Sequence, residues 1–117
     1  MDKFSALAEP TRRTILEMLA QHGQLPASAI YARFPVSHPA ISQHLKVLRE
    51  ARLVHMEKRA QQHIYQLNPQ AMAELEEWAR RMREQWDERF DALDKVLEAE
   101  KEKLLKEKNH EQDQTDS

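Results

Sequence analysis

The apolar residues in the second half of the chain recur at the spacing of one α-helical face. Eight of them span 25 residues in seven steps of three or four, a mean of about 3.6, which is the helical period. This apolar stripe consists of Met72, Leu75, Ala79, Met82, Trp86, Phe90, Leu93 and Leu97. Asn68 and Pro69 suit the start of the helix, which we expect to continue to about Lys108. A helix this long cannot bury its stripe against a small domain, so the pattern predicts a partner that covers it.

The length and composition restrict the possible organisation and the possible sites. The 117 residues predict a domain over residues 1–97, a charged extension of the last helix over 98–108 and a disordered polar tail over 109–117. The chain has no cysteine, which excludes disulfides and thiolate metal sites. No two histidines lie three or four residues apart, and only His110 follows His63. We therefore predict no metal site and no cofactor.

Charge is distributed unevenly between the two halves of the chain. Residues 1–67 carry nine Lys/Arg and five Asp/Glu, a balance of +4, whereas residues 68–117 carry nine and fifteen, a balance of −6. The basic half favours a polyanionic partner such as nucleic acid. The first ten residues lack the pattern of a secretory signal, and no apolar run is long enough to span a membrane. We therefore expect a cytoplasmic protein without a membrane partner.

Short helices and a hairpin are predicted before the long helix. Ile15, Leu16 and Leu19 give residues 10–22 an apolar face, and Gly23 is placed to end that helix. Residues 25–34 predict another short helix. The stretches 53–58 and 63–67 read as two strands, with residues 59–62 between them. Pairing Lys58 with His63 aligns the apolar residues of both strands on one face, which favours this register.

The helix expected over residues 37–51 carries the candidate binding face. Ser37 can cap it, and Ile41, Leu45 and Leu48 form its buried side. Together the elements predict a mainly α fold with a small β-hairpin, a winged helix-turn-helix whose second helix enters the major groove of double-stranded DNA. The predicted DNA contacts lie on the helix 37–51 and on the wing 58–63. They are Ser37, His38, Pro39, Ser42, Gln43, Lys46, Lys58, Arg59, Gln61, Gln62 and His63.

Three stretches of the chain resemble the ArsR family of winged-helix repressors: "FSALAEPTRRTILEMLA", "VSHPAISQHLKVLREARLV" and "HIYQLNP". The long last helix with "ERFDALDKVLE" is similar to a metal-independent branch of that family. The resemblance implies a homodimer that binds an inverted-repeat operator. It implies that the two protomers meet through the last helix and through a short first helix that carries Phe4 and Leu7. These two residues therefore join the apolar stripe as interface candidates. It also implies that the positions of His38, Pro39, Ser42 and Gln43 lie nearest the bases.

Two positions depart from the family pattern. The departures leave open a looser or differently shaped wing, and at the helix end either a phosphate contact or a left-handed cap formed at some cost. Wings of the family commonly carry glycine at the tip, where this chain has Ala60, and the second helix often ends in Ala-Gly-Leu, where this chain has Arg52. A backbone with positive φ would be strained at both positions. No residue identifies a small-molecule inducer.

Some individual residues, and the chain as a whole, admit other interpretations. Arg12 lies near the apolar face of its helix, which favours an internal salt bridge over a phosphate contact, and His44 favours packing over base contact. A winged-helix module that binds protein instead of DNA is the alternative function. It would require an acidic or apolar face on the helix 37–51, and the face is polar and basic. An enzyme is not expected, because the serines and histidines of that helix have no orienting acid.

Overall fold

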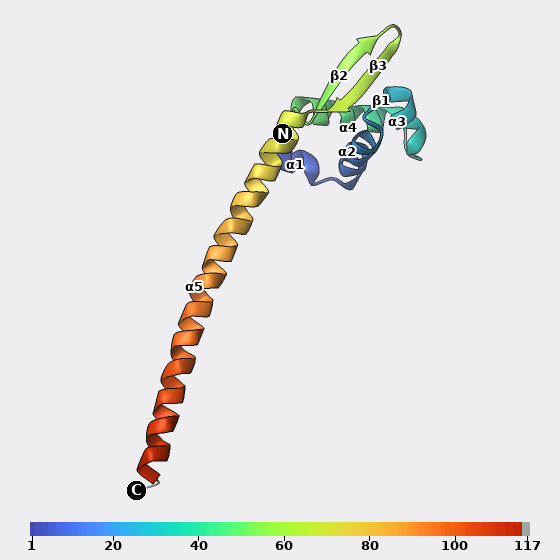
Figure 1. Cartoon of the computed structure of the whole chain (residues 1–117). Helices are drawn as coiled ribbons and strands as arrows, with labels where there is room; N and C mark the ends of the chain where they lie inside the picture. The colour runs from blue at the N-terminus through green and yellow to red at the C-terminus, as the bar shows by residue number, and fades with distance from the viewer. Residues whose placement is uncertain (116–117) are drawn as a thin grey trace. The chain divides into compact units, whose positions relative to one another are not determined.

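A computed structural model of the chain describes the backbone of residues 1–115 and the side chains of residues 1–109. It divides into two units, residues 1–75 and residues 76–117. The elements are α1 (Lys3–Leu7), α2 (Pro10–His22), β1 (Gln24–Pro26), α3 (Ala27–Arg33), α4 (His38–Glu50), β2 (Val54–Arg59), β3 (Gln62–Leu67) and α5 (Pro69–Thr115) (Figure 1). This order confirms the predicted winged helix-turn-helix, with α3 and α4 as the helix pair and β2–β3 as the wing.

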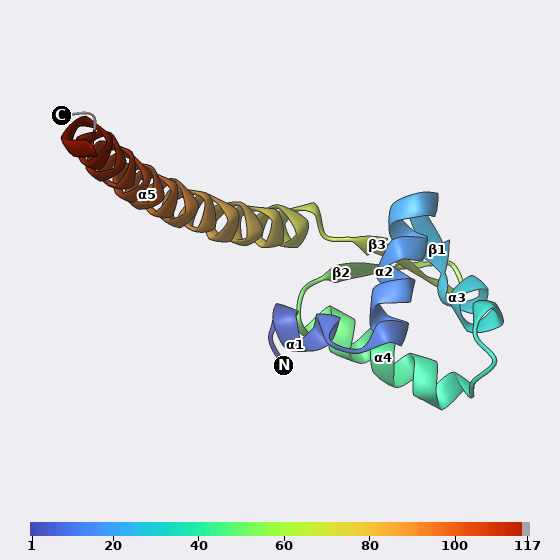
Figure 2. The ribbon, with the colours of Figure 1, turned by 90° about the horizontal axis from the view of Figure 1, so that it is seen from below.

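The sheet has three antiparallel strands in the order β1-β3-β2. Lys58 pairs with His63 and Met56 with Tyr65, so the predicted register of the hairpin is confirmed. The third strand, β1, was not predicted, and its Leu25 lies opposite Tyr65. Three residues that include a proline carry no alternating pattern, and their pairing depends on the fold bringing them to the edge of β3. In Figure 2, seen from below, α2 crosses in front of the sheet.

The hydrophobic core of the first unit forms where α2, α4 and the sheet meet. Ile15, Leu19 and Ile30 are fully buried, as the helical periodicity predicts, and so is the buried side of α4. On α1 the fully buried residue is Ala6, whereas Leu7 packs partly against the core and Phe4 is 47% exposed. The small side chain of Ala6 allows α1 to approach the core closely.

Helix α5 starts in the first unit and continues through all described residues of the second. The Asn68 side chain accepts a hydrogen bond from the N–H of Gln70 and donates one to the carbonyl of Arg52, so it fixes the start of the helix. The helix ends at Thr115 and not near Lys108, because the glutamate, lysine and glutamine residues after the stripe favour helix without packing. Of the tail expected to be disordered, residues 109–115 are therefore helical, and residues 116–117 lie outside the described residues. No described helix is long and apolar enough to cross a membrane.

Candidate nucleic-acid interface

The start of α4 is fixed by its own sequence. The Ser37 hydroxyl accepts a hydrogen bond from the N–H of Ala40 at 3.4 Å, and Pro39 lies in the first turn, as predicted. Ile41, Leu45 and Leu48 are each less than 2% exposed. Their burial fixes the rotation of the helix about its axis. The six residues of α4 and its cap that were predicted to contact DNA are all exposed: Ser37, His38, Pro39, Ser42, Gln43 and Lys46.

The end of α4 sets the path into the wing. The N–H of Leu53 bonds the carbonyl of Leu48, and the N–H of Arg52 bonds that of Arg49. Arg52 itself has φ +60°, so the helix closes with the left-handed Schellman arrangement in which glycine is usual. The chain then enters β2 directly, with Leu53 and Val54 buried. The position of the wing thus depends on this short connection.

The wing is a two-residue hairpin with a polar tip. Ala60 and Gln61 form the loop between the paired residues Arg59 and Gln62. The five predicted wing contacts are all exposed: Lys58, Arg59, Gln61, Gln62 and His63. The Arg59 guanidinium pairs with the Glu57 carboxylate at 3.0 Å, an exposed pair that water screens and that leaves the guanidinium accessible. None of the eleven predicted contact residues of α4 and the wing is acidic.

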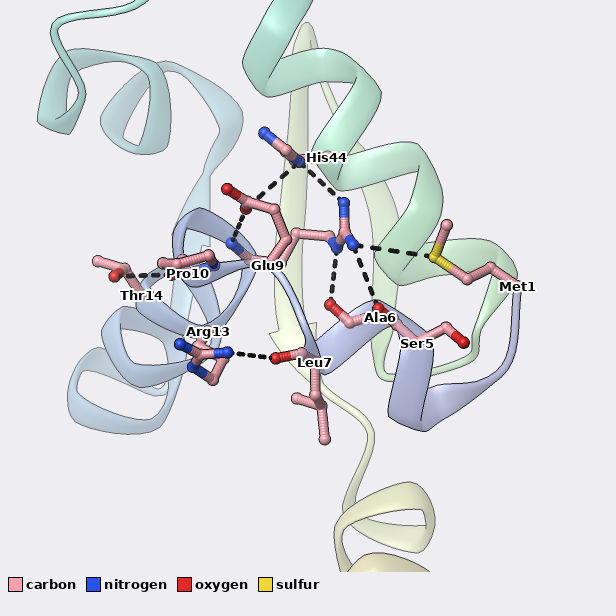
Figure 3. Close-up of polar contacts among 10 residues, drawn as sticks. Met1, Ser5, Ala6, Leu7, Glu9, Pro10, Arg13, Thr14 and His44 are labelled. Carbon is pink, nitrogen blue, oxygen red and sulfur yellow. Dashed lines mark hydrogen bonds and ion pairs between the residues drawn. The ribbon is translucent and has the colours of Figure 1, made fainter.

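Arg12 of α2 joins α1, α2 and α4, and its partners Ser5, Ala6 and His44 are labelled in Figure 3. Its Nε donates to the carbonyl of Ala6 at 2.7 Å, one terminal nitrogen donates to that of Ser5, and the other lies 3.3 Å from Nδ1 of His44. Arg12 as a whole residue is only 9% exposed. The predicted salt bridge of Arg12 is therefore wrong, because backbone carbonyls and an imidazole take the place of the carboxylate. The prediction that His44 packs within the protein is confirmed by this contact with Arg12.

Glu9 completes this network from the start of α2. Its carboxylate accepts a hydrogen bond from the N–H of Arg12 and lies 3.8 Å from Nδ1 of His44. Desolvation alone would raise the pKa of Glu9, but the hydrogen bond from Arg12 and the nearby His44 outweigh it, so the pKa is lowered. Glu9 thus stays ionised and caps α2 while it faces α4.

Two aromatic residues next to the interface were missed by the sequence reasoning. The Tyr31 ring of α3 stacks on the His38 ring of α4, with centroids 4.4 Å apart and planes 11° apart. Tyr65 of β3 is buried, which raises its pKa, while the positive charge of Arg49 acts in the opposite direction. The only signal for either was the position of an aromatic residue in a short element, and this does not identify a partner across the turn.

The candidate dimer residues divide by their exposure. Leu7, Met72 and Leu75 are partly buried and pack against the core of their own chain. The others are exposed: Phe4, Ala79, Met82, Trp86, Phe90, Leu93 and Leu97. Trp86 is 60% exposed, and its ring meets that of Phe90 edge to face at 5.3 Å. Within the part of the chain that the structure describes, no three His, Asp or Glu side chains are grouped as metal ligands.

Comparison with known proteins supports this interpretation. A family model for the helix-turn-helix domain matches residues 7–57. The chain is 49% identical to the HTH-type transcriptional regulator Rv2034 of Mycobacterium tuberculosis, over 62% of this chain and 66% of that protein, just under two thirds of its length. It is 35% identical to the transcriptional repressor SdpR of Bacillus subtilis, over 64% of this chain and 82% of that protein.

A solved structure agrees with both relatives. The ArsR-like transcriptional regulator from Rhodococcus sp. RHA1 superposes with a TM-score of 0.72 at 30% identity, over 82% of this chain and 87% of that one. Over the part that superposes, the two chains share the fold described above. By sequence and fold, the chain belongs to the ArsR family of DNA-binding winged helix-turn-helix transcriptional regulators.

Proposed function

We propose that the protein is a homodimeric repressor that binds an inverted-repeat operator through α4 and the wing. The observation that carries the proposal is the face of α4 that its buried stripe leaves open. This face is polar and basic, and its single acidic side chain, Glu50, lies at the far end of the helix. A helix with this face and a capped N-terminus fits the major groove, where amides and cations meet base edges and phosphates. A module that binds protein through this helix would need an apolar or acidic face there.

The repressor role rests on the resemblance and on the similarity to the transcriptional repressor SdpR of Bacillus subtilis. The dimer is supported by the large apolar side chains that α5 leaves open, such as Trp86 and Phe90. We call α4 the reading helix. Two-fold symmetry would place the two reading helices of a dimer about one helical turn of DNA, ~34 Å, apart on one face of the duplex. In bacteria such as those that contain these relatives, the DNA lies in the cytoplasm. The proposal therefore also places the protein there.

Within this interface we assign different tasks to Gln43 and Lys58. Gln43 is exposed on α4, and its amide can make two hydrogen bonds to the edge of an adenine. Lys58 is exposed on β2 next to the wing tip, where an ammonium group meets phosphate irrespective of sequence. A base contact and a phosphate contact have different signatures in binding experiments, so the two residues test the orientation of the whole interface.

The test compares Gln43→Ala and Lys58→Ala on a duplex selected by the protein from random DNA and on a random duplex. Gln43→Ala should cost about 1–3 kcal/mol per half-site on the selected duplex only and relax the preference at one symmetric base pair. Lys58→Ala should weaken binding to both duplexes. It should also reduce the slope of log affinity against log salt by about one per lost phosphate contact. Fluorescence anisotropy over a salt series measures both effects.

Two matched substitutions control for changes unrelated to the interface. Gln21→Ala removes an exposed glutamine of α2, and Lys95→Ala removes an exposed lysine of α5; both should bind like the unmodified protein. If Gln43→Ala weakened both duplexes equally and flattened the salt slope, α4 would not read bases through this face. If neither Gln43→Ala nor Lys58→Ala changed binding, the interface would lie elsewhere.

A further inference from the structure

Tyr31 provides a flat surface under the first residue of the reading helix. Its ring and that of His38 are nearly parallel, at 11°, with centroids 4.4 Å apart, which is the distance of a stacked pair. The two residues belong to the two helices of the helix-turn-helix, α3 and α4, so the stack spans the turn between them. Tyr31 is partly buried and packs against the hydrophobic core, whereas His38 is exposed. One ring is therefore held by the protein, and the other faces outward.

Tyr31 also lies beside the wing. With Ser28 of α3 it lines an open cleft of about 240 Å³ whose other wall is formed by Gln61, Gln62 and His63. These wing residues are among the predicted DNA contacts, as is His38. Tyr31 is thus the partly buried side chain that adjoins both DNA-facing elements, the start of α4 and the tip of the wing.

An exposed imidazole at the first position of a helix would otherwise sample several rotamers in water. Ordering such a side chain when DNA binds reduces affinity, and a side chain that is already ordered avoids this loss. We propose that Tyr31 is a positioning residue of the DNA interface: its ring holds the His38 imidazole in the orientation that DNA binding requires. This inference rests on the proposed function, in which the exposed start of α4 faces DNA.

The variants distinguish the effect of the aromatic ring from the effects of the hydroxyl group and of core packing. Tyr31→Phe keeps the ring, Tyr31→Leu keeps an apolar side chain that cannot stack, and His38→Ala removes the residue that is positioned. Tyr31→Leu should lower affinity for the selected duplex about two- to tenfold per half-site, the loss expected for one side chain that must be ordered on binding. Tyr31→Phe should bind within about twofold of the unmodified protein. In the His38→Ala background, Tyr31→Leu should cause no further loss.

A spectroscopic measurement reports the stack independently of DNA. The ring current of a stacked tyrosine shifts the carbon-bound protons of the His38 imidazole upfield in the NMR spectrum of the free protein. Tyr31→Phe should retain this shift and Tyr31→Leu should abolish it. Thermal unfolding of each variant measures its change in stability. If the role of Tyr31 were purely structural, this change would be the sole effect of the substitution. Because affinity is measured well below the unfolding temperature, the two readouts remain separate.

The possible outcomes decide between the alternatives. Additive losses in the Tyr31→Leu/His38→Ala double variant would overturn the inference, as would unchanged affinity of Tyr31→Leu once the upfield shift is lost. Equal losses for Tyr31→Phe and Tyr31→Leu would assign the effect to the hydroxyl and overturn it as well. These results leave the proposed function intact as long as Gln43→Ala still weakens the selected duplex. If Gln43→Ala and His38→Ala were both without effect, the proposed function itself would fail.

Discussion

Arg52 and Ala60 have a left-handed backbone at the two ends of the first wing strand. Their φ angles are +60° and +52°, and they are the only non-glycine residues with positive φ among residues 1–115. Both are positions where the resemblance leads one to expect glycine, and the predicted strain is present at both. Positive φ at the first loop residue alone matches the type II′ pattern, in which glycine is usual at that place. An alanine or arginine in this conformation costs about 1–2 kcal/mol.

Replacing the alanine at the wing tip should therefore stabilise the protein. Ala60→Gly should raise the free energy of unfolding by about 1 kcal/mol, less a few tenths for the greater freedom of glycine in the unfolded chain. Ala73→Gly is the matched control, because Ala73 is also exposed but lies in α5, where glycine should lower stability by about 1 kcal/mol. Urea unfolding measures both. A loss of stability in Ala60→Gly would mean that the tip relaxes to a turn without positive φ.

At the scale of the elements, Arg12 connects three helices through one side chain. Arg12→Met should lower the free energy of unfolding by about 1.5–3 kcal/mol, because the buried carbonyl of Ala6 and the partly buried carbonyl of Ser5 lose charged donors. Arg13→Met is a matched control, since Arg13 bonds the carbonyl of Leu7 but is exposed, and its loss should stay within about 0.5 kcal/mol. Denaturant unfolding measures both changes. Equal losses would show that the burial of Arg12 has no energetic consequence.

The elements also show what a sequence can predict and what it cannot. The register of the hairpin follows from the two-residue period of its strands, because one slip would turn every apolar side chain to the other face. The burial of α4 follows from its helical period in the same way. The pairing of β1 with β3 and the carbonyl partners of Arg12 have no such signal, since both depend on segments brought together by the fold. The same holds for the Tyr31–His38 stack across the turn.

At the scale of the whole molecule, regulation by a bound metal ion is not expected. The chain has no cysteine, and side chains of residues 1–109 include no group of three His, Asp or Glu that could hold an ion. Affinity for the selected duplex should therefore be equal with a chelator and with zinc or nickel added at the protein concentration. Calorimetric titration of the same ions into the protein supplies a control for weak binding. A stoichiometric loss of DNA binding on adding metal would contradict this prediction.

The apolar stripe of α5 is one pattern in the sequence but meets two environments in the structure. Met72 and Leu75 are partly covered by the core of their own chain, whereas Met82, Phe90 and Leu97 are exposed. A helical period reports which residues share a face, and it cannot tell which chain covers that face. The division becomes visible only when the core of the first unit is known. The candidate interface thus narrows to the exposed part of the stripe.

Exposed apolar side chains at this spacing are expected to be covered by a second copy of the chain. Trp86→Ala should weaken the dimer or its global stability by about 3–5 kcal/mol, the loss for a large side chain that is buried on assembly. Glu88→Ala is the matched control, because Glu88 lies about 160° from Trp86 around the same helix at 100° per residue and is also exposed. Sedimentation equilibrium should give a dimer for the unmodified protein and for Glu88→Ala, with a larger monomer fraction for Trp86→Ala. A stable monomer of the unmodified protein at micromolar concentration would contradict the dimer, and a two-fold operator would then require the two chains to meet on the DNA.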